Sequence, residues 1–233
     1  MREDVKHAVL EMYKQIAKAR EVQSERGKAD QGGRMGITSG KHLNAVAEII
    51  KRDLIKIGLS PDKIFDKGKM CTLPGWFRPT KDWDILAFEK NRLVAAIELK
   101  SISSSFGNNA NNRSEESIGS AYDALTAYKE NLFGNENIPP AIGYVMIVKS
   151  CEESQGGRRL YKTSHFPVDK VFQNISYLER FKILCQRLRR KSLYQAVWLV
   201  YVDPDSNSVT EPDPDMTYEK FLAILKFSYD IRK

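Results

Sequence analysis

The chain has 233 residues, 42% of them apolar and 29% charged, which is typical of a folded domain and not of a disordered chain. Lysine and arginine number 37 against 30 acidic residues, and the resulting net charge of +7 favours a polyanion as partner. Three widely spaced cysteines without a CxxC pair argue against a disulfide framework or zinc cluster and fit a reducing cytoplasm. The chain start has no signal-peptide core, and no apolar run approaches the ~20 residues of a membrane span. We therefore expect one domain over residues 1–233, cytoplasmic and without membrane contact.

Two amphipathic helices are predicted at the start of the chain. Apolar residues from Val5 to Ile16 recur at three- and four-residue steps and indicate a helix over residues 3–26. A second helix with the same period is expected over residues 40–57, and Gly58 is its predicted stop.

The pattern then changes to that of β-strands. Residues 70–77 predict a short strand broken by Pro74 and Gly75, and residues 84–90 and 93–100 predict two further strands joined by a hairpin at Asn91 and Arg92. The continuous apolar run "LVAAI" indicates a central strand that is covered on both faces.

A polar loop and five further elements follow. After a loop over residues 101–113, Ser114 is the predicted N-cap of a helix whose first turn holds Glu115 and Glu116. The elements expected from there are a helix over 114–133, a strand over 141–149, a helix over 174–191, a strand over 193–203 and a helix over 216–228. Hairpin strands followed by a helical crossover predict an α/β fold, with a mixed central β-sheet flanked by helices.

Three charged residues stand at the ends of the two hairpin strands. Glu98 and Lys100 project to one face because side chains alternate along a strand, and the hairpin brings Asp84 near them. Two adjacent carboxylates repel unless a cation lies between them, and their oxygens suit Mg²⁺. Lys100 would orient a water or stabilise charge on phosphorus. The spacing alone leaves open the alternative of a strand-end salt bridge between Glu98 and Lys100.

The loop after Lys100 is rich in groups that can contact DNA. Asparagine amides pair with adenine and arginine with guanine or phosphate, so this loop is a candidate for DNA contact, with turn formation as the alternative. The candidates are Asn108, Asn109, Asn111, Asn112 and Arg113.

Other charged and aromatic residues near the acids are secondary candidates. Arg78 and Lys81 are expected to contact DNA because they directly precede Asp84. Glu48 is a possible accessory metal residue acting through water, and the alternative is an exposed ion pair with Arg52. Trp76 and Phe77 are expected in the core rather than as base-stacking groups.

One long segment resembles a known enzyme family. "LPGWFRPTKDWDILAFEKNRLVAAIELKSISSSFGNNANNRSEESIGSAYDALTAYKENLFG" (73–134) is similar to the central block of the XhoI family of type II restriction endonucleases. The resemblance implies the PD-(D/E)xK nuclease fold, Mg²⁺, a homodimer and cleavage of palindromic duplex DNA, with CTCGAG as the family target. It implies that Asp84 and Glu98 are the catalytic and metal-binding acids and Lys100 the catalytic lysine. Trp83 replaces the proline that names the superfamily.

These observations together predict an Mg²⁺-dependent type II restriction endonuclease that leaves 5′-phosphate and 3′-hydroxyl ends. The metal ligands would be Asp84, Glu98 and the Leu99 carbonyl, and a cognate DNA methyltransferase would act on the same site. Two alternatives remain open: a structure-specific or repair nuclease on the same core, and a non-catalytic DNA-binding protein.

Overall fold

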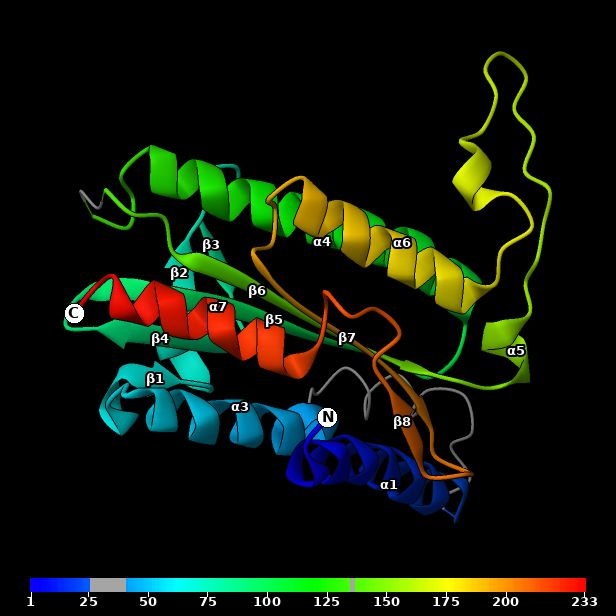
Figure 1. Ribbon diagram of the computed structural model, residues 1–233, viewed down its shortest axis with the longest axis horizontal. Helices are drawn as coiled ribbons and strands as arrows, with labels where there is room; N and C mark the ends of the chain where they lie inside the picture. Colours follow the sequence, from blue (N-terminus) through cyan, green and yellow to red (C-terminus); the bar gives the residue numbers. More distant parts are fainter. Residues whose placement is uncertain (26–40, 135–136) are drawn as a thin grey trace.

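A mixed β-sheet with helices on both faces forms the centre of the protein (Figure 1). The computed structural model describes residues 1–25, 41–134 and 137–233. The strands lie in the order β1 (Ile64–Phe65), β4 (Ile85–Glu89), β5 (Arg92–Ile102), β6 (Ala141–Lys149), β7 (Ala196–Asp203) and β8 (Ser208–Thr210). The β5–β6 and β6–β7 pairs are parallel, and the other pairs are antiparallel. The predicted α/β fold with a mixed central sheet is confirmed.

The helices form one layer on each face of the sheet. On one face lie α1 (Glu3–Glu25), α3 (Asn44–Ile57) and α7 (Tyr218–Asp230), and on the other lie α4 (Phe106–Lys129) and α6 (Tyr177–Arg190). Shorter helical segments are α5 (Glu152–Gln155) and the 3₁₀ turns Lys41–Leu43, Pro61–Lys63, Gly68–Cys71 and Lys170–Phe172. Within the described part of the chain, no helix combines the length and the apolar character needed to cross a membrane.

The alternation of β5 assigns its side chains to two separate cores. Ile97 and Leu99 pack in the core under α1, α3 and α7. Ala96 and Ile102 pack in the core under α4 and α6. Residues two apart on a strand lie on the same face, so Glu98 and Lys100 lie on the face of Ala96 and Ile102, which is covered by α4. This placement brings the charged residues of β5 under α4.

Several predicted elements are confirmed with small shifts. The two N-terminal helices are present, although residues 26 and 40, at their predicted ends, lie outside the described residues. Gly58 ends α3 with φ 123°, a backbone conformation that glycine adopts without steric cost. The hairpin between β4 and β5 turns one residue earlier than expected, at Lys90 and Asn91.

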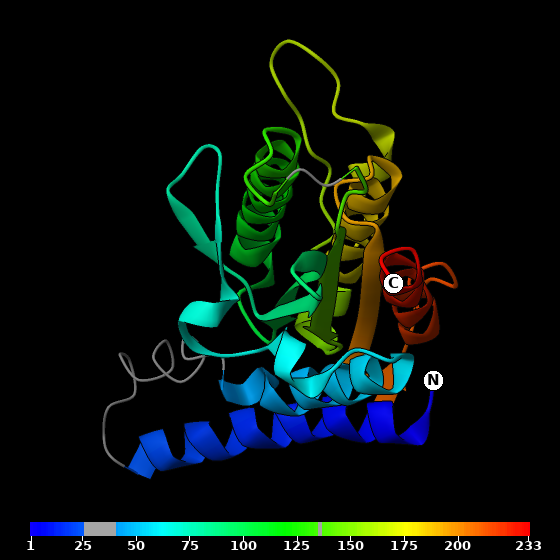
Figure 2. The same cartoon turned by 90° about the vertical axis from the view of Figure 1, so that its left-hand side faces the viewer.

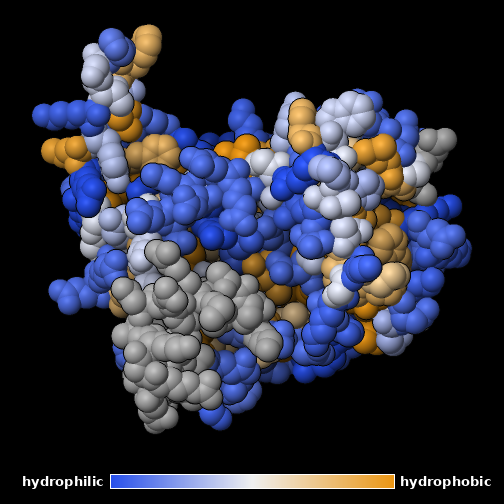
Figure 3. Space-filling view, turned by 180° about the vertical axis from the view of Figure 1, so that it is seen from behind, coloured by the Kyte–Doolittle hydropathy of each residue, from blue (hydrophilic) through white to orange (hydrophobic). Residues whose placement is uncertain are grey.

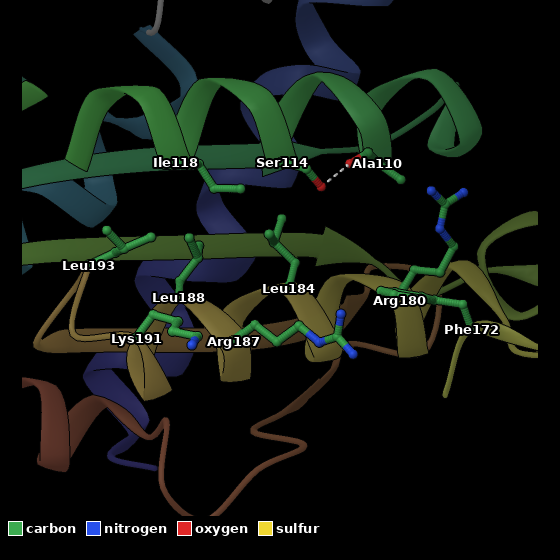
Figure 4. Close-up of a pocket in the computed structure, with 10 residues that line it drawn as sticks. All are labelled: Ala110, Ser114, Ile118, Phe172, Arg180, Leu184, Arg187, Leu188, Lys191 and Leu193. Carbon is green, nitrogen blue, oxygen red and sulfur yellow. Dashed lines mark hydrogen bonds between the residues drawn. The ribbon is translucent and has the colours of Figure 1, made fainter. Parts of the chain in front are cut away.

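The prediction of a loop over residues 101–113 is wrong. Strand β5 continues to Ile102 and α4 begins at Phe106, so Ser114 lies inside the helix and is not its N-cap. Its hydroxyl donates to the Ala110 carbonyl one turn earlier, at 2.8 Å (Figure 4). Buried Phe106, Ala110, Ser117 and Ala121 form a stripe at helical spacing. Tertiary packing of this stripe outweighs the weak helix propensity of the asparagines.

The prediction for residues 70–77 is also wrong in part. Here β2 (Thr72–Pro74) pairs with β3 (Thr80–Asp82) in a separate hairpin, which stands beside α4 and away from the central sheet (Figure 2). Trp76 and Phe77 are 48% and 65% exposed and do not belong to the core as expected. Strands β1, β3 and β8 have only two or three residues, too few to show a period in the sequence.

Asp53 links three helical segments on the α1 face. It is 2% exposed and accepts hydrogen bonds from the Arg2 guanidinium at 2.6 Å and the Tyr218 hydroxyl at 2.9 Å. Lys56 lies 3.2 Å away. Burial by itself raises the pKa of Asp53, but Arg2, Tyr218 and Lys56 hold it below its ordinary value. The ionised carboxylate therefore stabilises the fold.

We expect Asp53→Asn to lower the free energy of unfolding at pH 7 by about 2 kcal/mol, because it removes the buried carboxylate that accepts a charge-assisted hydrogen bond from Arg2 and a hydrogen bond from Tyr218. The depressed pKa stabilises the parent fully above the unfolded value of about 3.9, and this contribution is lost as pH falls through the folded pKa. Urea unfolding between pH 7 and pH 3 should thus show a flatter pH dependence for the variant. The exposed Glu219 lies 4.0 Å from Arg2, and Glu219→Gln is the control, with a change below about 0.5 kcal/mol. Equal effects of both variants would contradict the prediction.

Candidate active site

The candidate site lies where β5 extends beyond its antiparallel partner. The last pair of the β4–β5 ladder joins Ile85 to Ile97, and β5 runs on to Ile102. Asp84 precedes β4: its backbone N–H donates to the Ile97 carbonyl at 3.1 Å, and its Oδ2 accepts from the Leu99 N–H at 2.6 Å. The Asp84 carboxylate is therefore fixed against the free edge of β5 at Leu99, the residue between Glu98 and Lys100.

Glu98 is a buried carboxylate with three donors around it. Its residue exposure is 2%, and its Oε1 lies 2.8 Å from Lys100 Nζ and 3.5 Å from Lys81 Nζ. The Tyr194 hydroxyl donates to Oε2 at 3.3 Å. Burial raises the pKa of Glu98, but the ammonium groups of Lys100 and Lys81 outweigh it and hold this pKa below its ordinary value. Glu98 is therefore ionised at neutral pH.

Lys100 and Asp84 differ in how their charges are compensated. Burial lowers the pKa of Lys100, but Glu98 and Glu116 together raise it above its ordinary value. For Asp84, burial dominates and raises the pKa, although the Leu99 N–H and Lys100 act in the opposite direction. Among the described residues, Asp84 has no salt bridge at 4.0 Å or less. A bound cation would therefore stabilise the ionised form of Asp84 more than that of the other carboxylates in this cluster.

The oxygen donors of the cluster fit a hard divalent cation. The N–H and C=O of one residue in an extended strand point to the same side, so the Leu99 carbonyl faces the free edge on which Asp84 lies. Two carboxylates and one carbonyl are the donors that Mg²⁺ takes, with water and phosphate oxygens completing its shell. No group of three or more His, Cys, Asp or Glu side chains suited to a metal occurs in the described ranges.

The predicted DNA contacts Arg78, Lys81 and Arg113 are all engaged within the protein. Arg78 Nε donates to Asp123 at 2.8 Å. The Lys81 ammonium lies over the Trp83 ring, 4.8 Å from its centroid, as well as near Glu98. Arg113 pairs with Glu116 at 2.6 Å. DNA contact by these residues therefore requires them to share or exchange these partners.

The structure separates the four asparagines into two pairs. Asn109 donates to the Ser104 and Ser105 carbonyls at 2.9 and 3.2 Å, and Asn111 accepts from Arg180 at 3.0 Å. Arg180 reaches across from α6 at the end of a pocket between the two helices (Figure 4). Asn108 and Asn112 are exposed and lie one turn apart on the same face of α4. This second pair is the better placed for reading bases.

Glu48 makes no hydrogen bond or ion pair with Asp84, Glu98 or Lys100 in the described part of the chain. It is exposed on α3, and α3 packs on the face of the sheet opposite to Glu98 and Lys100. Its accessory role stays a prediction without geometric support.

Two residues of the cluster were not found from the sequence. Tyr194 donates to Glu98 and to the Ser117 carbonyl, at 3.3 and 3.1 Å, and Glu116 pairs with Lys100 at 2.7 Å. Glu116 was assigned to a first helical turn, but it lies in the third turn of α4, because the helix begins at Phe106. The i, i+3 spacing of Arg113 and Glu116 was the available signal, and it depends on the correct helix start.

A turn of the β2–β3 hairpin is held rigidly beside the site. The carboxylate of Asp123, on α4, is 2% exposed and accepts from the Trp76 and Phe77 N–H groups at 2.8 and 2.7 Å. A Cβ at Gly75 would lie 2.7 Å from Asp123 Oδ2, so only glycine fits there. The Phe77 ring stacks on Tyr122 with centroids 5.8 Å apart. The molecule thus presents exposed aromatic groups here, on the side opposite to α7 (Figure 2). The face seen from behind in Figure 3 is mainly hydrophilic, with scattered apolar patches.

Comparisons with known proteins identify the class of protein. The mixed six-stranded sheet flanked by helices, together with relatives that are restriction enzymes, defines a restriction-endonuclease-like core. The family model described as restriction endonuclease XhoI matches residues 22–211, and the chain belongs to this family. It is therefore a type II restriction endonuclease, a site-specific deoxyribonuclease acting on double-stranded DNA.

Three relatives are type II restriction enzymes by name. XhoI of Xanthomonas vasicola is 40% identical over 72% of this chain and 67% of its own length. BstVI of Geobacillus stearothermophilus is 36% identical over 84% of this chain and 90% of its own length. AbrI of Azospirillum brasilense is 41% identical over 69% of this chain and 72% of its own length. No solved structure matches the chain.

We expect Asp123→Ala to release the hairpin turn, because it removes the acceptor of two backbone N–H groups and of the Arg78 guanidinium. The free energy of unfolding should fall by about 3 kcal/mol, and limited proteolysis should cut faster within residues 75–79. Glu130→Ala, at the exposed end of α4, is the control and should change neither. An unchanged proteolysis rate in Asp123→Ala would contradict this role.

Proposed function

We propose that this enzyme uses Mg²⁺ to hydrolyse both strands of a palindromic site, leaving 5′-phosphate and 3′-hydroxyl ends. The observation that carries the proposal is the cluster of Asp84, Glu98 and Lys100 at the free edge of β5. Its acids supply oxygen donors for the metal, and its lysine supplies a nearby positive charge. The resemblance to the family favours CTCGAG as the target and a cognate methyltransferase that modifies the same sequence.

Each residue of the cluster has a distinct task in this proposal. Asp84 and Glu98 hold the metal together with the Leu99 carbonyl, and Lys100 orients the attacking water and stabilises charge that develops on the phosphate. Tyr194 keeps Glu98 Oε2 in place through its hydroxyl. When bound, Mg²⁺ supplies a Lewis acid that polarises the phosphoryl oxygen and lowers the pKa of water.

A palindromic site calls for a two-fold assembly, so we propose a homodimer in which each protomer cuts one strand. Sedimentation of the protein alone should then give twice the 26.6 kDa of one chain, and the complex with a short duplex that contains the site should have the mass of two chains plus one duplex. A single chain per duplex under conditions of cleavage would contradict the dimer but not the chemistry.

We expect plasmid DNA that contains CTCGAG to be cut into discrete fragments with Mg²⁺, and Asp84→Asn to give none. Lys100→Ala should lower the single-turnover rate about 100- to 1,000-fold, because it removes charge stabilisation from the transition state. The matched control is Asp82→Asn. Asp82 is an exposed acid two residues from Asp84, and its carboxylate accepts from the Thr72 hydroxyl outside the cluster, so its variant should cleave like the parent.

The outcomes of this experiment separate the three functions. Fragments mapped to one palindrome support restriction activity, and cleavage of only branched or damaged DNA would indicate a structure-specific or repair nuclease. Binding without any strand break in the parent would indicate a non-catalytic DNA-binding protein. End-labelling of the fragments gives the cut position and the end groups.

A further inference from the structure

The acid Glu116 on α4 forms the outer part of the charge cluster. Its Oε1 lies 2.7 Å from Lys100 Nζ and its Oε2 lies 2.6 Å from Arg113. Lys100 also pairs with Glu98 at 2.8 Å, so a continuous chain of ion pairs runs from Glu98 through Lys100 and Glu116 to Arg113. Its central ion pair connects strand β5 to helix α4.

The position of Glu116 is fixed by the packing of α4. Ser117, the next residue, is 1% exposed, and its carbonyl accepts from the Tyr194 hydroxyl at 3.1 Å. The same hydroxyl reaches Glu98. Helix α4, the tyrosine before β7 and the acid on β5 are therefore tied at one point, directly beside the carboxylate that holds Lys100. The side chain of Glu116 remains 38% exposed, so it lies at the rim of the cluster.

Lys100 needs a second acid in order to act beside a metal. An ammonium group has three donors, and Glu98 Oε1 takes one of them in this structure. A cation held by Glu98 competes with Lys100 for the same oxygen and repels its charge. Without another anion, Lys100 would either block that oxygen or turn away from the site. Glu116 lies 2.7 Å from Lys100 and is not a proposed metal ligand. It can therefore hold the ammonium group without competing with the metal for an oxygen.

We propose that Glu116 is a positioning residue, which holds the catalytic amine of Lys100 in place while Glu98 binds the metal. Arg113 supports it from the other side by fixing the second carboxylate oxygen. The proposal rests on the proposed function, because Lys100 must take part in phosphodiester hydrolysis. It predicts that removing the charge of Glu116 impairs the chemical step through Lys100 and leaves DNA binding intact.

The test compares Glu116→Gln with Glu115→Gln, its exposed neighbour on the same helix. We expect Glu116→Gln to lower the single-turnover rate about 10- to 100-fold, the usual effect of losing a residue that orients a metal-site group. KM and metal-free DNA affinity should stay at parent values. Calorimetric titration of the protein with Ca²⁺ should show weaker binding, because Lys100 then relies on Glu98 alone. Glu115→Gln should match the parent in every measurement.

A double variant distinguishes positioning from a general structural role. If Glu116 acts through Lys100, adding Glu116→Gln to Lys100→Met should cost no further rate, because neighbouring residues that act as a unit are not additive. The same 10- to 100-fold loss in both backgrounds would overturn the proposal. So would a parent-like rate in Glu116→Gln, or a loss of DNA affinity equal to the loss of rate. Urea unfolding of each variant reports whether the fold is intact.

Failure of this inference differs visibly from failure of the proposed function. If the parent does not cut the palindrome with Mg²⁺, the proposed function fails, whatever Glu116 does. If the parent cleaves and Lys100→Ala is impaired while Glu116→Gln is not, the nuclease proposal stands and the positioning role is overturned.

Discussion

The burial of the Glu98 carboxylate is the constraint on which the rest of the site depends. A carboxylate that is 2% exposed loses its hydration and persists as an anion only if partners replace the lost water. Lys100, Lys81 and Tyr194 supply these contacts from β5, the β2–β3 hairpin and the segment before β7. Each of these segments is thereby placed around one strand position. The strand itself is held by pairing with β6 on its other edge, where Glu98 lies opposite Tyr144.

The charges around Glu98 form a nearly balanced set. Asp84, Glu98 and Glu116 face Lys81, Lys100 and Arg113, and their formal charges cancel. A divalent cation alone would add two positive charges to this set, whereas a phosphodiester brings negative charge with it. Under the proposed function, this balance favours binding of the metal together with DNA over binding of the metal by itself. It also explains why basic residues expected to contact DNA are paired with acids in the free protein.

Sequence reasoning predicted that Asp84, Glu98 and Lys100 lie close together, because this proximity depends on short-range rules. Parity along one strand placed Glu98 and Lys100 on one face, and hairpin pairing placed Asp84 beside them. Glu116 and Tyr194 were not predicted. The position of Glu116 depends on where α4 begins, and that of Tyr194 on how the segment before β7 packs. The helix start at Phe106 follows from burial of a stripe that includes serine and alanine, and local propensities in a run of asparagines do not reveal it.

The corrected start of α4 changes the relation between recognition and catalysis. A loop over residues 101–113 would have separated the asparagines from the acids by flexible chain. As one helix, the asparagines, Arg113 and Glu116 move as a rigid unit, and exposed Asn108 and Asn112 lie within about two turns of the residue that holds Lys100. Any contact that the exposed asparagines make with DNA is therefore linked to Lys100 through one helix and the Glu116 ion pair.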